Sequence, residues 1–290
     1  MRLTTTKQVS QNAKNSPRMW KPQMLELSHG TTSVCSAKVR IGLSEKGLEW
    51  HSHQINLTKG EQHRPEYLRL NPKGVVPTLV DGGLVVVESS VILEYIDDLG
   101  TGPRLIPKNP QDSARARMWL ARCIDVHAAI NTMTFSTVGR SRIRAAKTPE
   151  EAEAAILRMP NPAARAKRRD LFNLGLESPH VDAAFFILRS LFHDMQTILD
   201  RGPWLLGTRY SLADVALVSY VDRLDRLGFS GLWDRHTPQV GRWLTASRAR
   251  QSYKKGILDY AGDVETDKMR TAGAPFWPDV QYRWGKVLNL

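Results

Sequence analysis

The sequence predicts an α/β domain over residues 23–100, followed by an all-α domain over residues 111–258. Three observations support this division. Apolar and polar residues alternate in short segments of the first hundred residues, as half-buried β-strands require. Residues 100–110 then contain three prolines and two glycines, which is typical of a linker. Beyond the linker the apolar residues recur mainly with helical spacing. A chain of 290 residues is long enough for two such domains.

The first domain is expected to run strand, helix, strand, helix, hairpin and helix. The first helix is predicted to end at Lys46, because Gly47 can adopt the left-handed conformation that follows a helix C-terminus. Pro65 is acceptable in the first turn of the second helix. The predicted strands are residues 24–27, 50–57, 78–80 and 84–87, and the predicted helices are residues 37–46, 60–68 and 89–99. This is the order of a thioredoxin-like fold.

The hairpin is the best-defined segment of the first domain. Asp81-Gly82-Gly83 stands between two β-branched runs, which indicates a tight turn. Pro77 precedes the hairpin, where a proline cannot donate to a sheet ladder, and the Val76–Pro77 bond can be fixed as cis. That geometry would turn the backbone of Val76 outward, ready to pair with a bound peptide. We expect Ser89 to cap the next helix, leaving its first N–H groups free for an anionic ligand.

The second domain shows helical periodicity in residues 112–135, 181–199, 212–227 and 239–247. Ser211 and Asp214 form a capping box in which Asp takes the usual place of Glu, and its role is in folding. Residues 138–179 interrupt the domain and are expected to form an insertion with one short helix. The tail, residues 259–290, is polar but carries aromatic residues, which suggests that it docks onto the rest of the chain.

Composition narrows the class of protein. Hydrophobic residues make up 41% of the chain, and no apolar run approaches the ~20 residues that a membrane span needs. Residues 1–22 are polar and basic without the core of a signal peptide, so we expect a disordered extension and a cytoplasmic protein. The two cysteines, Cys35 and Cys123, provide no disulfide framework.

The net charge of the chain is +12, and it is unevenly distributed. Residues 140–169 hold nine basic and three acidic residues, which predicts a solvated basic surface and no nucleic-acid contact.

Residues 71–96, which hold the Pro77 loop, the hairpin and the Glu88-Ser89 pair, resemble the glutathione-binding half of glutathione transferases. The resemblance implies a glutathione transferase fold, with glutathione as co-substrate, and a homodimer. In that family the proline loop and the acidic-Ser pair hold the tripeptide. The resemblance therefore implies that Val76 and Pro77 bind the backbone of glutathione. Glu88 would pair with the γ-glutamyl ammonium group, and Ser89 would bind the adjacent carboxylate. No metal is required.

The loop before the first helix is the candidate site for the glutathione sulfur. In Ser33-Val-Cys35-Ser36, the position of Ser33 matches the serine of zeta-type enzymes, Cys35 matches the beta-class cysteine, and Ser36 matches a serine of β-aryl-etherase-type enzymes. We predict that Ser33 is the catalytic residue, with Cys35 and Ser36 as alternatives. Lowering a thiol pKa from ~8.5 to ~6.5 takes ~2.7 kcal/mol, and one hydrogen bond to a charged acceptor supplies ~1.5–3 kcal/mol. A hydroxyl donor is therefore nearly sufficient.

Residues 60–72 resemble the same stretch of nu-class and β-aryl-etherase-type bacterial enzymes, where the glutamine contacts the glycyl end of glutathione. This nominates Gln62. The same enzymes share a Pro-x-Pro insertion followed by an Arg-rich run, and here Pro160-Asn161-Pro162 leads to Arg165–Arg169. They cleave β-aryl ethers of lignin-derived ketones. The resemblance therefore implies thiolate attack on a hydrophobic, aromatic electrophile in a pocket formed by the helical domain. Candidate residues for the pocket wall are Met118, Trp119, Phe135 and Phe172.

Two alternatives remain open at this point. One is a protein of the same fold that binds glutathione without catalysis. The other is a glutathione-dependent thiol oxidoreductase that uses Cys35, which stands two positions beyond the usual nucleophile. His51 and His53 alternate on one strand face, but no third ligand stands near them in sequence, so we expect no metal site there.

Overall fold

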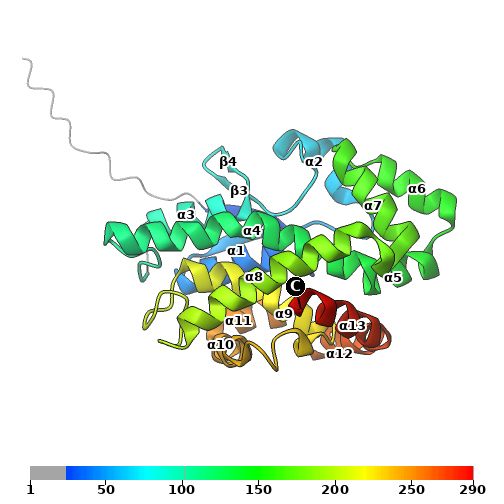
Figure 1. Cartoon of the computed structure of the whole chain (residues 1–290). Helices are drawn as coiled ribbons and strands as arrows, with labels where there is room; N and C mark the ends of the chain where they lie inside the picture. Colours follow the sequence, from blue (N-terminus) through cyan, green and yellow to red (C-terminus); the bar gives the residue numbers. More distant parts are fainter. Residues whose placement is uncertain (1–23, 101, 290) are drawn as a thin grey trace, which may run out of the picture.

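The computed structural model describes residues 24–100 and 102–289 and contains a small mixed sheet packed against a large set of helices (Figure 1). The predicted basic extension, residues 1–22, lies outside the described residues. None of the helices in the described part of the chain is long and apolar enough to cross a membrane.

The sheet of the first domain has the strand order β2-β1-β3-β4. Strand β1 pairs in parallel with β2 and antiparallel with β3, and β3 forms the predicted hairpin with β4. Three helices and a 3-10 turn complete the domain, in the order predicted for a thioredoxin-like fold. The strands are β1 Leu25–His29, β2 Trp50–Gln54, β3 Thr78–Asp81 and β4 Leu84–Val86, and the helical elements are α1 Val34–Glu45, η1 Glu61–His63, α2 Pro65–Leu70 and α3 Ser89–Asp98.

Helix α1 is buried on both of its faces. Val39 and Leu43 pack with the strands of the first domain, whereas Val34 and Ile41 pack with the core of the helical domain. The approach between helices is close, since a Cβ on Gly42 would lie 2.4 Å from a methyl group of Leu93 on α3. The helix therefore connects the two cores, and its first turn is fixed by both.

The helical domain is organised around a buried helix, α9, which packs against α4, α10 and α1. Ser211 caps α9 in the predicted capping box with Asp214. The Asp214 carboxylate also accepts hydrogen bonds from the backbone N–H of Leu205 at 2.9 Å and from the Trp243 indole at 2.8 Å. The helices of this part are α4 Pro110–Ser136, α8 Pro179–Leu199, α9 Leu212–Arg226, α10 Pro238–Arg248 and α11 Gln251–Tyr253, followed by the π-helical turn Lys254–Leu258.

The insertion differs from the prediction of one short helix. It contains α5 Val138–Ala146, α6 Pro149–Leu157 and α7 Pro162–Leu174, followed by a 3-10 turn at Gly175–Glu177. Thr148 starts α6 with a capping box, and Asn161 caps α7 with its side-chain oxygen. The segment between them reverses the chain at Pro160. Pro149 and Pro162 therefore stand at the first positions of helices, where a missing N–H costs nothing.

The tail forms α12 Asp263–Gly273 and α13 Trp277–Leu288, and α13 packs against α8. Trp284 is buried and contacts the rings of Phe185 and Phe192. A Cβ on Gly231 would lie 2.2 Å from the Trp277 ring, so this close approach requires glycine. Trp277 and Trp284 thus attach the tail to the helical domain.

Candidate active site

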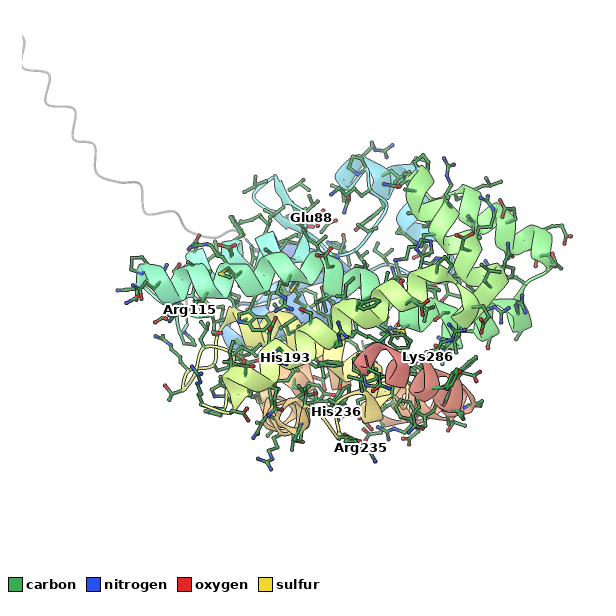
Figure 2. The ribbon with its side chains drawn as sticks, in the orientation of Figure 1. Glu88, Arg115, His193, Arg235, His236 and Lys286 are labelled. Atoms are coloured by element: carbon green, nitrogen blue, oxygen red, sulfur yellow. The ribbon has the colours of Figure 1, made fainter. Side chains whose placement is uncertain are left out.

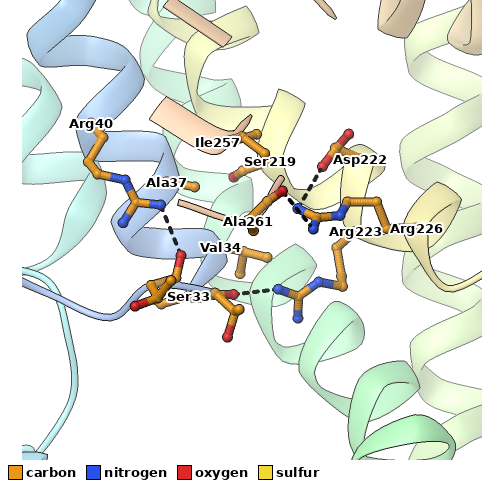
Figure 3. Close-up of a pocket in the computed structure, with 12 residues that line it drawn as sticks. Ser33, Val34, Ala37, Arg40, Ser219, Asp222, Arg223, Arg226, Ile257 and Ala261 are labelled. Atoms are coloured by element: carbon orange, nitrogen blue, oxygen red, sulfur yellow. Dashed lines mark hydrogen bonds and ion pairs between the residues drawn. The ribbon is translucent and has the colours of Figure 1, made fainter. Parts of the chain in front are cut away.

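The loop between β1 and α1 is held in place by arginines from two elements. Arg40 of α1 donates to the backbone oxygens of Gly30 at 3.1 Å and Thr31 at 3.2 Å. Arg223 of α9 donates to the backbone oxygen of Thr32. Three successive carbonyl groups therefore turn toward guanidinium groups, which fixes the path of the chain as it enters α1 at Ser33 (Figure 3).

Ser33 is the N-cap of α1 and is half-buried. Its oxygen accepts a hydrogen bond from the backbone N–H of Ser36 at 3.2 Å, which leaves its own O–H free to donate to another acceptor. The helix therefore starts three residues earlier than predicted, because the cap lies at Ser33. A hydroxyl at the positive end of a helix is well placed to stabilise a thiolate.

The other two candidates in this loop have different surroundings. Ser36 is fully buried, and its hydroxyl oxygen accepts from the backbone N–H of Gly30 at 3.1 Å, so it stabilises the loop itself. Cys35 is half-buried and turns toward the helical domain. Its sulfur lies 3.3 Å from Nδ1 of His127 on α4 and 3.6 Å from the Tyr220 hydroxyl on α9.

The surroundings of Cys35 favour its thiolate. Burial by itself raises the pKa of the thiol, but the charge and the hydrogen bond of His127, the charge of Lys38 and the hydrogen bond of Tyr220 together lower it to about 6. The pKa of His127 is raised; burial lowers it, but the Cys35 charge and hydrogen bond outweigh burial. Each group therefore favours the charged form of the other, the Cys35 thiolate and the His127 imidazolium, across the two domains.

The loop predicted to hold the glutathione backbone has the expected geometry. The Val76–Pro77 peptide bond is cis. Val75, which precedes this bond, is anchored. Its backbone oxygen accepts hydrogen bonds from the Tyr67 hydroxyl at 2.7 Å and from the Asn71 amide at 2.9 Å. Tyr67 also contacts the Thr78 hydroxyl at 2.9 Å, which ties the loop to strand β3.

The acidic-Ser pair departs in one respect from the prediction. Glu88, and not Ser89, is the N-cap of α3, and no side chain caps the helix. Glu88 has φ = 67°, a left-handed conformation that is rare outside glycine and is enriched at functional sites. Its carboxylate lies 2.5 Å from the Lys73 ammonium, and both side chains are exposed. Figure 2 shows Glu88 at the hairpin side of the molecule. Ser89 becomes the first residue of the helix because the turn occurs at Glu88.

Gln62 lies in the 3-10 turn η1, and its side-chain oxygen is buried without a hydrogen-bond partner among the described residues. The neighbouring His63 has a pKa lowered by burial and by the charge of Arg158, a residue of the insertion. The insertion therefore reaches the side of the first domain on which Gln62 lies, and Figure 1 shows α6 and α7 beside α2.

The four residues predicted as candidates for the pocket wall do not form one surface. Met118 is 67% exposed, whereas Trp119 is buried in the core. The Phe135 ring is covered by the guanidinium of Arg168, 3.2 Å from its centroid, and Phe172 lies 5.4 Å from the guanidinium of Arg144. Only the two phenylalanines are partly exposed, and the insertion's arginines cover them.

Sequence reasoning missed His127, Tyr220 and Lys38. His127 is 92 residues from Cys35 and stands in a helix whose pattern gives no sign that a histidine faces the loop. Lys38 is fully buried on α1 and donates to the Ser90 hydroxyl at 2.8 Å. A lysine among apolar residues at this position was the one available signal, because a fully buried lysine requires a partner.

His53 pairs with Glu26 at 2.8 Å, and its ring contacts His51. Over residues 24–100 and 102–289, no group of three or more His, Cys, Asp or Glu side chains could hold a metal ion.

A family model of the glutathione S-transferase N-terminal domain matches residues 32–99. Protein LigF of Sphingobium sp. (strain NBRC 103272 / SYK-6) is 31% identical over 227 residues, which are 76% of this chain and 88% of that protein. The tetrachloro-p-hydroquinone reductive dehalogenase of Sphingobium chlorophenolicum is 27% identical over 79% of this chain and 94% of its own length.

The crystal structure of the beta-etherase LigF from Sphingobium sp. strain SYK-6 is similar to this structure with a TM-score of 0.72 and 29% identity, over 81% of this chain and 98% of that one. The sequence match and the structural match to LigF thus both extend over the two domains. The chain belongs to the glutathione S-transferase superfamily and is an enzyme that uses glutathione as its co-substrate.

Proposed function

We propose that this enzyme cleaves β-aryl ethers of aromatic ketones, such as those derived from lignin, by nucleophilic attack of glutathione. The observation that carries the proposal is the similarity to beta-etherase LigF, which extends over both domains. The thiolate of glutathione attacks the carbon that bears the aryloxy group, a C–S bond forms, and the C–O bond breaks. The adjacent carbonyl activates that carbon, and the aryloxy group leaves as a phenoxide.

We propose Ser33 as the residue that stabilises the glutathione thiolate. Its O–H is free to donate, and it lies at the N-terminus of α1, where the helix dipole also favours an anion. Glutathione would extend from there along the Val76–Pro77 loop. Glu88 would exchange Lys73 for the γ-glutamyl ammonium, Ser89 would bind the neighbouring carboxylate, and Gln62 would reach the glycyl end.

The substrate proposal is tested by assaying a fluorogenic β-aryl ether ketone beside a generic aryl halide, each with glutathione. Release of the fluorescent phenol, together with the glutathionyl ketone, is the expected result. Turnover of the halide alone would refute the etherase proposal and leave the transferase activity in place.

A second activity is favoured by the Cys35–His127 pair. With a thiol pKa of about 6, Cys35 can attack a mixed disulfide of glutathione, form a Cys35–glutathione disulfide and release the other thiol. A second glutathione would then restore Cys35 and leave as glutathione disulfide. In a mixed-disulfide assay, Cys35→Ser is expected to abolish this activity and to preserve ether cleavage. The opposite pattern would assign the main reaction to Cys35 and not to Ser33.

We also propose a homodimer and a cytoplasmic location. Exposed apolar side chains lie on β4, α3 and α4, and β4 is the edge strand of the sheet. They are Leu84, Val85, Val91, Met118 and Ile124, with exposures of 39–74%. Light scattering of the protein and of a Met118→Glu variant tests the dimer, which the variant should weaken.

The proposed cytoplasmic location is supported by the cysteines. Both are free, which fits a compartment that keeps thiols reduced.

A further inference from the structure

A small cavity of about 20 Å³ lies behind the loop that carries Ser33, between that loop and α9 (Figure 3). This is room for one water molecule or one small ion. The side chains around it include three guanidinium groups and one carboxylate, a net charge of +2. The charged residues are Arg40, Arg223, Arg226 and Asp222.

The one carboxylate at the cavity is already engaged elsewhere. Oδ1 of Asp222 accepts hydrogen bonds from Arg248 at 2.6 Å and from the Tyr253 hydroxyl at 2.6 Å. Its other oxygen lies 3.9 Å from Arg226. Arg223 forms no ion pair with any carboxylate of the described residues, and burial lowers its pKa to about 10. Asp222 is therefore shared among several cations, and positive charge exceeds negative charge at the cavity.

Two polar atoms at the cavity have no partner. The Ser219 hydroxyl and Nε of Arg226 are buried without a hydrogen bond among the described residues. Both residues line the cavity, and their exposures are 2% and 5%. Both groups can donate a hydrogen bond, and a buried donor without an acceptor costs about 1–3 kcal/mol. Two unpartnered donors and an excess of positive charge thus meet at one small cavity.

We propose that this cavity binds one small monovalent anion, of the size of a halide, between Ser219, Arg226 and Arg223. The anion accepts hydrogen bonds from the two unpartnered donors and compensates the guanidinium charges. Because Arg223 also holds the Thr32 carbonyl, the bound anion stabilises the loop that carries Ser33. The site does not depend on which substrate the enzyme uses.

Bromide is the probe, because it scatters anomalously and is close in size to chloride. Crystals soaked in sodium bromide are expected to show an anomalous peak between Ser219 Oγ and Arg226 Nε. In solution, the melting temperature of the enzyme is expected to rise by about 2–4 °C in sodium bromide relative to sodium gluconate at equal ionic strength.

Matched variants separate the site from general salt effects. Arg226→Gln removes a cavity guanidinium, and Arg242→Gln removes an exposed one whose only hydrogen bond among the described residues is to Gln239. The bromide-dependent shift should disappear in the first and persist in the second. Ser219→Ala removes a hydroxyl that has no partner, so it costs the fold no hydrogen bond, and it should reduce the shift at least twofold.

The Ser219→Ala variant keeps the proposal testable if Arg226→Gln fails to fold. A cavity that holds only water in the bromide-soaked crystals would overturn the proposal. An equal bromide shift in the wild type, Ser219→Ala and Arg226→Gln enzymes would also overturn it.

Discussion

Replacing His127 by leucine is expected to raise the pKa of the Cys35 thiol from about 6 to 9 or above. The wild-type value lies three units below the ordinary value of 9.0, which corresponds to about 4 kcal/mol in favour of the thiolate. His127 provides the largest lowering contribution through its charge and its hydrogen bond. In the variant the burial of Cys35 remains, and only Lys38 and Tyr220 oppose it.

The assay is alkylation of Cys35 by iodoacetamide between pH 4.5 and 9.5, with the modified peptide quantified by mass spectrometry. Because the thiolate reacts and the thiol does not, the rate follows the deprotonated fraction. The wild-type rate should rise with pH through a midpoint near 6. At pH 7 the His127→Leu rate should be about 100-fold lower, as a shift of three units requires.

Two controls accompany this experiment. His193→Leu removes an exposed histidine of α8 (Figure 2) and should leave the midpoint near 6. Cys123 is buried and has a raised pKa, so its peptide should stay unmodified at pH 7. A midpoint near 6 in His127→Leu would refute the thiolate–imidazolium pair.

Three further predictions concern the site and the fold. Ser33→Ala should raise the thiol pKa of bound glutathione by about 1–2 units, read from thiolate absorbance against pH, and an unchanged value would remove Ser33 from the proposed role. Glu88→Ala should weaken glutathione binding by about 2–4 kcal/mol in calorimetry, whereas Lys73→Gln, which breaks an exposed pair, should leave the affinity equal or slightly higher. Glutathione affinity unchanged in Glu88→Ala would contradict the placement of the γ-glutamyl group. Asp214→Ala should cost about 3–5 kcal/mol of unfolding free energy in urea, because it leaves buried donors unpaired, and the exposed control Asp267→Ala should cost almost none.

The features that the sequence predicted correctly are those determined by residues close together in the chain. The turn at Gly82-Gly83, the cis bond before Pro77 and the capping box at Ser211 each depend on a few neighbouring residues. The start of α1 was predicted three residues too late, because two serines that can cap a helix, Ser33 and Ser36, stand close together. The start of α3 at Ser89 was predicted correctly, but its cap was not. For α3 the backbone turns at Glu88, which no propensity favours in a left-handed conformation.

The partners of Cys35 could not be found from the sequence. A thiol pKa depends on groups brought together by tertiary packing, and His127 and Tyr220 come from two different helices of the other domain. The insertion was underestimated because its prolines resemble loop residues unless the caps at Thr148 and Asn161 are noticed. The cavity behind Ser33 likewise combines residues of α1, α9 and the π-helical turn.

The burial of α1 on both faces has a consequence for how the chain unfolds. The helix contributes side chains to two cores, so separating the domains would expose Val34 and Ile41 and would also pull Cys35 away from His127. Neither domain can open without losing contacts of the other, and denaturation should follow a single cooperative transition. The nucleophilic character of Cys35 then reports directly on domain association, because the thiolate persists only while the two halves stay together.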